Sequence, residues 1–180
     1  HPGFLKATGK KKSIFDRFVL PFEKASYQEA KYVVAHSRLV EGEIRTYYQI
    51  PVPRLFLIPP PVDLSIFKPQ KDEGEKPCGI RLSSFPQLKD KTTFLFVSSS
   101  HARKGFKLLE KYFENTDLPI ALAVAGRPIS RKDYKNICYV GYEKNMAALY
   151  AQTDFSILAS IYEPFGLVPI ESLCMGVPVA

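Results

Sequence analysis

Two polar segments in this sequence each follow an apolar run of strand length and hold residues that could bind an anionic or hydroxyl-rich ligand. The first, residues 98–105, ends in Arg103, Lys104 and Gly105, immediately before a helical pattern. A helix N-terminus has free N–H groups and a partial positive charge, so an adjacent Arg and Lys would suit a diphosphate. The alternative is an exposed basic turn, because short phosphate motifs are weak signals by themselves.

The second segment, residues 160–166, contains Glu163 and Gly166 and also precedes a helical pattern. Glu163 could accept hydrogen bonds from sugar hydroxyls, and Gly166 permits a positive φ or a close backbone approach to a ligand. The alternative for Glu163 is a carboxylate that only favours the helix dipole. Eight residues later, Glu171 lies in an otherwise apolar helical stretch. A carboxylate there is costly unless it is paired or bound, so its position favours a ligand contact.

Strands that alternate with amphipathic helices must position these segments. The strand-like runs are 32–35, 54–58, 93–97, 120–125, 137–140 and 154–158; the helical patterns are 13–32, a helix capped by Ser37 that ends before Pro51, 106–113, 145–151 and 168–174. Pro21 is expected to kink or split the first helix. Residues 70–90 are polar and suit a connector, with one short helix near 79–84. The alternation predicts parallel sheets covered on both faces, with ligands at the carboxyl ends of the strands.

Composition narrows the class of protein. The 180 residues include 46% hydrophobic and 24% charged residues, which is typical of a globular chain. No apolar run approaches the roughly 20 residues of a transmembrane helix. Three scattered cysteines, Cys78, Cys138 and Cys174, argue against a disulfide scaffold and a closely spaced zinc site, so we expect no metal and a reducing cytoplasm.

The net charge of +7 raises the question of an anionic partner. The lysines are dispersed and no nucleic-acid motif is present, so we expect no nucleic acid. Near the N-terminus, basic residues with apolar ones nearby are interpreted as a solvated basic turn, with peripheral contact with anionic lipid as the alternative that would fit a lipid-linked acceptor. The residues concerned are Phe4, Leu5, Lys6, Lys10, Lys11, Lys12, Ile14 and Phe15.

Residues 163–171, Glu-Pro-Phe-Gly-Leu-Val-Pro-Ile-Glu, resemble the E-x7-E motif of glycosyltransferase family 4. The resemblance extends over nearly the whole chain, because further segments stand in family order. These are 33–37, 58–63, 67–69, 103–105, 141–142, 149–150, Asp154 and 176–179.

The resemblance implies an α/β protein of the GT-B fold with parts of two Rossmann-like domains, each with a parallel sheet. Residues 1–69 would be the C-terminal portion of the acceptor domain, 70–90 the hinge, and 91–180 the N-terminal portion of the nucleotide-sugar domain. Because residue 1 is His and residues 177–180 read as a strand just beginning, we expect a piece of a longer protein.

The resemblance also implies roles for individual residues. Lys104, with Arg103 beside it, would contact the donor diphosphate and stabilise the charge on the leaving phosphate without a metal. Glu163 would hold hydroxyls of the donor sugar rather than act as a nucleophile, and Glu171 would bind ribose hydroxyls. Further donor-binding positions are Phe165, Gly166, Leu167 and Val168 in the turn, with Gly126 and Tyr142 near the nucleobase.

The implied activity is that of a retaining glycosyltransferase that uses a nucleotide-diphosphate sugar, with a UDP-sugar expected, and a glycan or lipid-linked acceptor. The three prolines 59–61, the long helical pattern before them and residues 103–105 resemble the branch with lipopolysaccharide-core glucosyltransferases. That branch implies cell-envelope or lipopolysaccharide synthesis in the cytoplasm, at the inner membrane face. The alternatives are a noncatalytic nucleotide- or anion-binding module of the same fold, and an epimerase or phosphorylase, against which the E-x7-E pattern argues.

The sequence departs from the family pattern at several points. Ser98 stands where many relatives carry an Arg, so diphosphate binding would depend more on Arg103 and the serine amides. The glycine-rich loop of the N-terminal domain and the end of the C-terminal domain are absent from this chain. His1 lies in roughly the region of a histidine near the donor sugar, whereas His36 is interpreted as structural. We therefore expect some functional residues to lie outside this chain.

Overall fold

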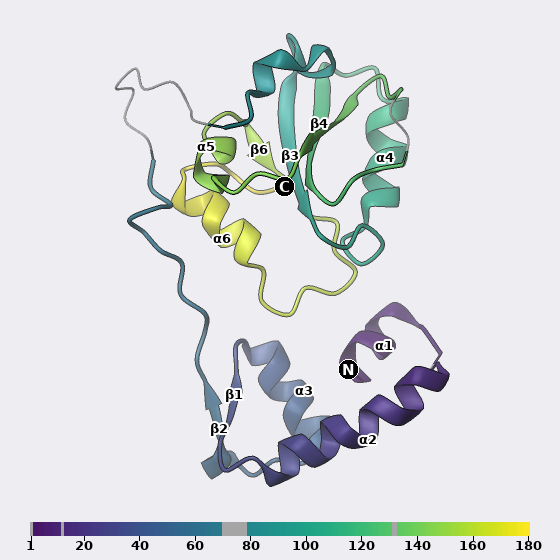
Figure 1. The fold of residues 1–180 in the computed structure, drawn as a ribbon, viewed down its shortest axis with the longest axis vertical. Helices are drawn as coiled ribbons and strands as arrows, with labels where there is room; N and C mark the ends of the chain where they lie inside the picture. Colours follow the sequence, from purple (N-terminus) through teal and green to yellow (C-terminus); the bar gives the residue numbers. More distant parts are fainter. Residues whose placement is uncertain (1, 12, 70–78, 131–132) are drawn as a thin grey trace. The chain divides into compact units, whose positions relative to one another are not determined.

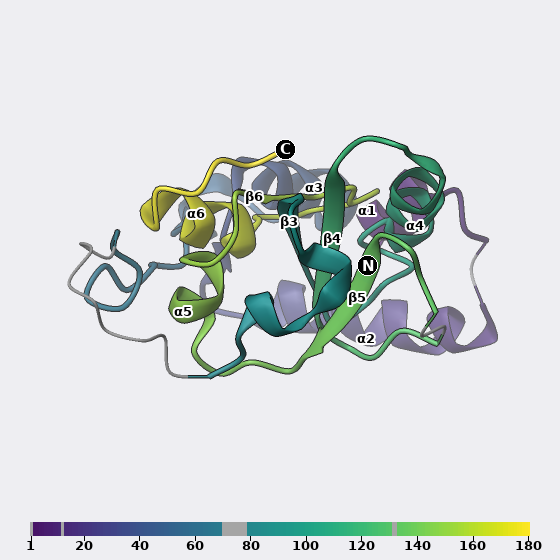
Figure 2. The same cartoon turned by 90° about the horizontal axis from the view of Figure 1, so that it is seen from above.

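The computed structural model describes residues 2–11, 13–69, 79–130 and 133–180, and their contacts divide the chain into two compact units. The first unit comprises residues 1–61 and 161–165, and the second comprises 62–160 and 166–180. Figures 1 and 2 show their elements in two views. Predictions for His1, Lys12, Cys78 and residues 70–78 of the connector fall on residues outside the described ranges. The boundaries that the family resemblance implies, between the acceptor domain, the hinge and the nucleotide-sugar domain, stay a prediction.

The first unit contains a short parallel sheet and three helices. Strands β1 (Val33–Ala35) and β2 (Leu55–Leu57) pair in parallel, and α3 (Arg38–Tyr48) packs against them. The Ser37 hydroxyl accepts a hydrogen bond from the N–H of Val40 at 3.1 Å, which is the predicted N-cap. The other elements are α1 (Pro2–Thr8), the 3-10 turn η1 (Val52–Arg54) and α2 (Ile14–Glu29). The amphipathic pattern of the sequence did not predict α1.

Helix α2 is continuous through Pro21, so of the expected kink or split the split is wrong. Ser13 and Asp16 form a capping box at its start, which satisfies N–H groups at both ends of the first turn. Proline removes one N–H from the ladder, and here that loss does not end the helix. Within the described ranges, every helix is too short or too polar to cross a membrane.

The second unit is built on a four-stranded parallel sheet in the order β5–β4–β3–β6. Its strands are β3 (Thr92–Ser98), β4 (Ile120–Gly126), β5 (Ile137–Gly141) and β6 (Phe155–Ser156). From β3 the chain moves outward to β4 and β5, and then returns to the other side of β3 as β6. Such a reversal of strand order opens a crevice at the carboxyl ends of the two strands where it occurs, here β3 and β6.

Helices cover both faces of this sheet, as the alternating pattern predicts (Figure 1). On one face, α4 (Phe106–Asn115) packs Phe113 against apolar strand residues such as Phe96 and Val124. On the other face lie α5 (Met146–Tyr150) and the chain that follows α6 (Leu167–Cys174). The 3-10 turns η2 (Leu82–Ser84) and η3 (Pro86–Leu88) also pack there, and η2 corresponds to the short helix expected near 79–84.

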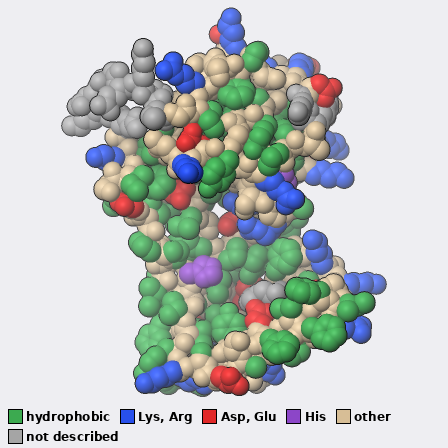
Figure 3. All heavy atoms as spheres, viewed as in Figure 1, with side chains coloured by type: hydrophobic (Ala, Val, Ile, Leu, Met, Phe, Trp, Pro, Cys, Tyr) green, Lys and Arg blue, Asp and Glu red, His purple; other side chains and the backbone are tan. Residues whose placement is uncertain are grey.

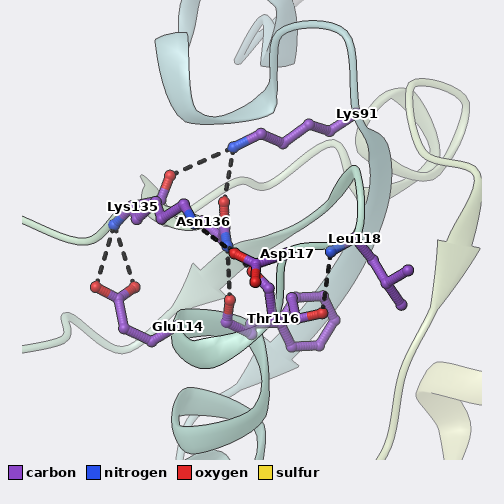
Figure 4. A network of polar contacts seen from close by, with 8 residues as sticks. Lys91, Glu114, Thr116, Asp117, Leu118, Lys135 and Asn136 are labelled. Atoms are coloured by element: carbon purple, nitrogen blue, oxygen red, sulfur yellow. Dashed lines mark hydrogen bonds and ion pairs between the residues drawn. The ribbon is translucent and has the colours of Figure 1, made fainter.

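A polar network fixes the amino-terminal edge of the sheet (Figure 4). Asn136 is 2% exposed and donates from Nδ2 to the carbonyl oxygens of Phe113 and Thr116, at 2.8 and 3.2 Å. Its Oδ1 accepts a hydrogen bond from Lys91 Nζ at 2.7 Å. Because ligands of such sheets bind at the opposite edge, this network has a structural role.

Candidate active site

The loop after β3 holds a buried lysine at the carboxyl edge of the sheet. Lys104 is 9% exposed, and its Nζ donates to the carbonyl oxygen of Val97 at 3.2 Å. A buried ammonium group is costly unless polar groups surround it, so this carbonyl contact helps keep the charge in place. Arg103 beside it is half-buried. The predicted basic loop therefore carries one buried cation and one partly exposed cation immediately before α4.

Gly105 brings this loop against the residues that follow β6. Its φ is +75°, and a Cβ at this position would lie 2.0 Å from the carbonyl oxygen of Ala159. Any side chain would force the two loops apart, so glycine is required for the contact. Gly166, which begins α6, has a φ of +82°, another left-handed conformation. Two left-handed glycine turns, Gly105 after β3 and Gly166 after β6, thus precede α4 and α6.

The loop after β4 is tied to the loop after β3. A Cβ on Gly126 would lie 2.6 Å from the carbonyl oxygen of Ser98, which accepts a hydrogen bond from the N–H of Arg127 at 2.8 Å. His101 Nε2 lies 2.8 Å from the carbonyl oxygen of Arg127 and so acts as the donor. Sequence reasoning named Gly126 and missed His101 and Arg127. The available signal was that both follow adjacent strands at one sheet edge.

Glu171 is half-buried on α6 and is partly paired. Its Oε2 accepts a hydrogen bond from the hydroxyl of Tyr150 at 3.1 Å, and Tyr150 is 0% exposed. Burial, followed by the charge of Glu171, raises the pKa of the Tyr150 phenol, which therefore remains a proton donor. The sequence identified Glu171 as a costly carboxylate but missed the tyrosine that pairs with it.

The Glu143 carboxylate shapes the loop after β5, which also contains the predicted Tyr142. The Glu143 carboxylate accepts hydrogen bonds from the N–H groups of Ile80 at 2.9 Å and Asn145 at 2.7 Å. These backbone donors hold the pKa of Glu143 below its ordinary value. The Tyr142 side chain is 76% exposed at the carboxyl end of β5.

Residues 161–165 belong by their contacts to the first unit. The Tyr162 hydroxyl donates to Glu43 Oε2 at 2.6 Å, and the Phe165 ring meets the His36 ring edge-on at a centroid distance of 6.2 Å. Burial, followed by the hydrogen bond to Glu43, raises the pKa of Tyr162. This segment is therefore held by specific side-chain contacts.

The predicted site residues divide between the two units. Glu163 and Phe165 are part of the first unit. The second unit contains the others, namely Arg103, Lys104, Gly126, Tyr142, Gly166, Leu167, Val168 and Glu171. Among the described residues, no group of three or more His, Cys, Asp or Glu is arranged to hold a metal ion.

Residues 82–180 match the family described as "Glycosyl transferases group 1". The chain belongs to this family. Over 179 residues it is 40% identical to a probable transglycosylase of Burkholderia thailandensis, an alignment that covers 99% of this chain and 48% of that protein.

Solved structures agree on the fold. WaaG, a glycosyltransferase involved in lipopolysaccharide biosynthesis, aligns with a TM-score of 0.72 at 19% identity and covers 97% of this chain and 52% of its own. HepE of Anabaena in complex with UDP-glucose aligns with a TM-score of 0.68 at 17% identity, over 86% of this chain and 45% of its own. The predicted GT-B fold is thereby confirmed. The chain spans about half the length of these relatives.

Proposed function

We propose that the protein containing this chain is a retaining glycosyltransferase that moves a sugar from a nucleotide-sugar donor to a glycan or lipid-linked acceptor. The observation that carries the proposal is the buried Lys104 at the carboxyl edge of β3, beside the glycine contact that joins the two loops of the strand-order reversal. Membership of the group 1 family supports the reaction class. The UDP-glucose bound by HepE supports a UDP-sugar as the donor.

In the proposed reaction, the bond between the anomeric carbon and the donor phosphate breaks, and negative charge grows on the leaving diphosphate. Lys104, Arg103 and the N–H groups that begin α4 would stabilise that charge. Glu163 would hold hydroxyls of the donor sugar while the acceptor attacks the same face. Removal of one such charge-stabilising contact typically costs about 2.7–4 kcal/mol of activation free energy.

The remaining assignments concern donor recognition. Glu171 would bind the ribose hydroxyls. The backbone of the turn would meet the sugar and the β-phosphate through Phe165, Gly166, Leu167 and Val168. Gly126 and Tyr142 would lie near the nucleobase.

Calorimetry of UDP, GDP and ADP with the full-length protein tests the donor site. We expect one of the three diphosphates to bind. Lys104→Met should weaken the affinity for that diphosphate by about 100-fold, the effect of a lost charge-assisted contact. Lys107→Met is the matched control, since Lys107 is exposed on α4 and should change the affinity less than about twofold. Absence of binding by the folded protein, or equal effects of the two variants, would contradict the proposal.

A noncatalytic module of the same fold is the second candidate, because it would bind the same diphosphates. It differs in that no sugar is released or transferred. Incubation of the full-length protein with UDP-glucose, followed by measurement of free UDP and glucose, separates the two: slow hydrolysis supports the transferase, and stable bound donor supports the module.

We further propose an envelope role in the cytoplasm with peripheral contact at the inner membrane face, which the involvement of WaaG in lipopolysaccharide biosynthesis supports. In the first unit, none of the α2 residues is buried, and Phe18 and Phe22 are 66% and 74% exposed. Hydrophobic side chains gather over α2 with Lys and Arg beside them (Figure 3). Such a face suits anionic lipid.

Co-sedimentation of the full-length protein with anionic vesicles tests this contact. A Phe18→Ser/Phe22→Ser variant should lose vesicle binding and keep its melting temperature. A lowered melting temperature instead would mean that this face packs against protein, and would contradict the membrane assignment.

A further inference from the structure

Tyr150 occupies an unusual position for a polar side chain. It is the last residue of α5, is 0% exposed, and belongs to the hydrophobic cluster that covers one face of the sheet. Its ring meets Phe67 edge-on at a centroid distance of 6.3 Å. A phenylalanine would pack there equally well, so the hydroxyl needs an explanation of its own.

The hydroxyl reaches out of this cluster to α6. It lies 3.1 Å from Glu171 Oε2 and 3.2 Å from the carbonyl oxygen of Val168. Both neighbours can only accept, and the phenol has one proton to donate. A bond to an ionised carboxylate is about twice as strong as one to a neutral oxygen, so the proton belongs mainly to Glu171. Because burial raises the pKa of the phenol, this donor persists at any pH the protein tolerates.

The second carboxylate oxygen of Glu171 has a different environment. The only hydrogen bond that Glu171 side-chain oxygens receive within the described residues is the one from Tyr150 to Oε2. The residue is half-buried, so Oε1 can still be reached from outside the protein core. With one oxygen fixed, rotation about the last side-chain bond is restricted, and the direction of the other oxygen is set.

We propose that Tyr150 is a positioning residue that fixes the Glu171 carboxylate so that its second oxygen accepts hydrogen bonds from the vicinal hydroxyls of a ligand. Under the proposed function, on which this inference rests, that ligand part is the ribose of the donor nucleotide. Tyr150 itself touches no ligand; it preorganises the group that does, which reduces the ordering cost of binding.

The test compares UDP with 2′-deoxy-UDP and 3′-deoxy-UDP by calorimetry on the full-length protein. In the wild type, loss of the recognised hydroxyl should weaken binding by roughly 10- to 100-fold, the effect of one hydrogen bond to a charged group. Tyr150→Phe should weaken UDP by about 5- to 10-fold and leave the deoxy analogue nearly unchanged, so that the ratio between them shrinks. A purely structural role would lower both affinities equally.

Tyr134→Phe is the matched control. Tyr134 is 5% exposed and its hydroxyl also donates to a glutamate, Glu110, in the hydrophobic cluster on the opposite face of the sheet. This variant loses a similar bond and should keep the wild-type ratio. The inference would be overturned if Tyr150→Phe kept the wild-type ratio of UDP affinity to deoxy-UDP affinity, or if Tyr134→Phe reduced that ratio as much as Tyr150→Phe does.

Glu171 variants keep the inference testable if Tyr150→Phe does not fold. In Glu171→Gln, the Tyr150 hydroxyl would hold the amide oxygen and direct the amide NH2 to the ligand, so part of the hydroxyl discrimination should survive. In Glu171→Ala, no discrimination between UDP and its deoxy analogues should survive. If Glu171→Gln and Glu171→Ala lose this discrimination equally, the positioning role is overturned and the donor site stays intact. If the folded wild type binds no diphosphate, the proposed function itself fails.

Discussion

The contact between Gly105 and Ala159 allows the cost of a single methyl group to be worked out. Gly105→Ala places a Cβ in a backbone with a φ of +75°, and 2.0 Å from a carbonyl oxygen. The left-handed conformation costs a non-glycine residue about 1–2 kcal/mol. Relief of the overlap requires backbone movement, which typically costs about 1–3 kcal/mol in a packed structure. The expected loss in free energy of unfolding is therefore about 2–5 kcal/mol.

Gly176→Ala separates these two contributions. Gly176 lies in the same unit and has nearly the same φ, +77°, but the nearest atom to its added Cβ would be Pro69 Cγ at 3.8 Å, an ordinary contact. This variant should show the conformational cost alone, about 1–2 kcal/mol. The difference between the two variants measures the overlap at the loop contact.

Denaturant unfolding of the two variants, with linear extrapolation to water, supplies both free energies. Gly105→Ala should also bind the donor diphosphate more weakly, because its loop precedes α4 and carries Lys104. If the free energies of unfolding differ by less than about 0.5 kcal/mol, within the error of the extrapolation, the two loops are not in backbone contact and the reasoning fails.

Three further predictions concern single residues. Asn136→Ala leaves two backbone carbonyl groups without their donor and should lower the free energy of unfolding by about 1–3 kcal/mol in denaturant titration; a loss below about 0.5 kcal/mol would contradict its structural role. The folded pKa of Glu143 lies below the unfolded value, so its contribution to stability is present above that unfolded value and is lost as the pH falls through the folded pKa. Glu143→Gln should therefore lose less stability than the wild type between about pH 5 and 3, measured by thermal unfolding; parallel curves would argue against the loop hydrogen bonds. Burial raises the pKa of Cys138 to about 12, so in a Cys78→Ser background a thiol reagent should label the half-buried Cys174 first; mass spectrometry showing equal rates would contradict the buried thiol.

Local patterns in the sequence predicted most of the elements. Ser37 caps α3 as expected, because a cap depends on groups within one turn of the chain. The apolar runs became parallel strands of the second unit, because a strand buried on both faces must be apolar throughout. Pro21 is the exception, since its propensity to break a helix was outweighed in α2.

The E-x7-E motif was also visible in the sequence, because its residues are close together in the chain. It pointed to Glu171 and the glycine turn before it, and the family comparison confirms the glycosyltransferase family. Whether Glu163 and Glu171 bind the donor stays a prediction. The motif could not say how Glu171 is held.

The contacts that shape the candidate site depend on the tertiary structure. Tyr150 meets Glu171 because the end of α5 lies beside α6, and Gly105 meets Ala159 because β6 returns to the side of β3. Lys104, buried in the loop that Gly105 ends, donates to the carbonyl oxygen of Val97. The sequence alone determined which residues could do the chemistry, since residue type and local spacing are properties of the chain. The order of the strands decided which of those residues meet, because that order brings together loops that are far apart in sequence.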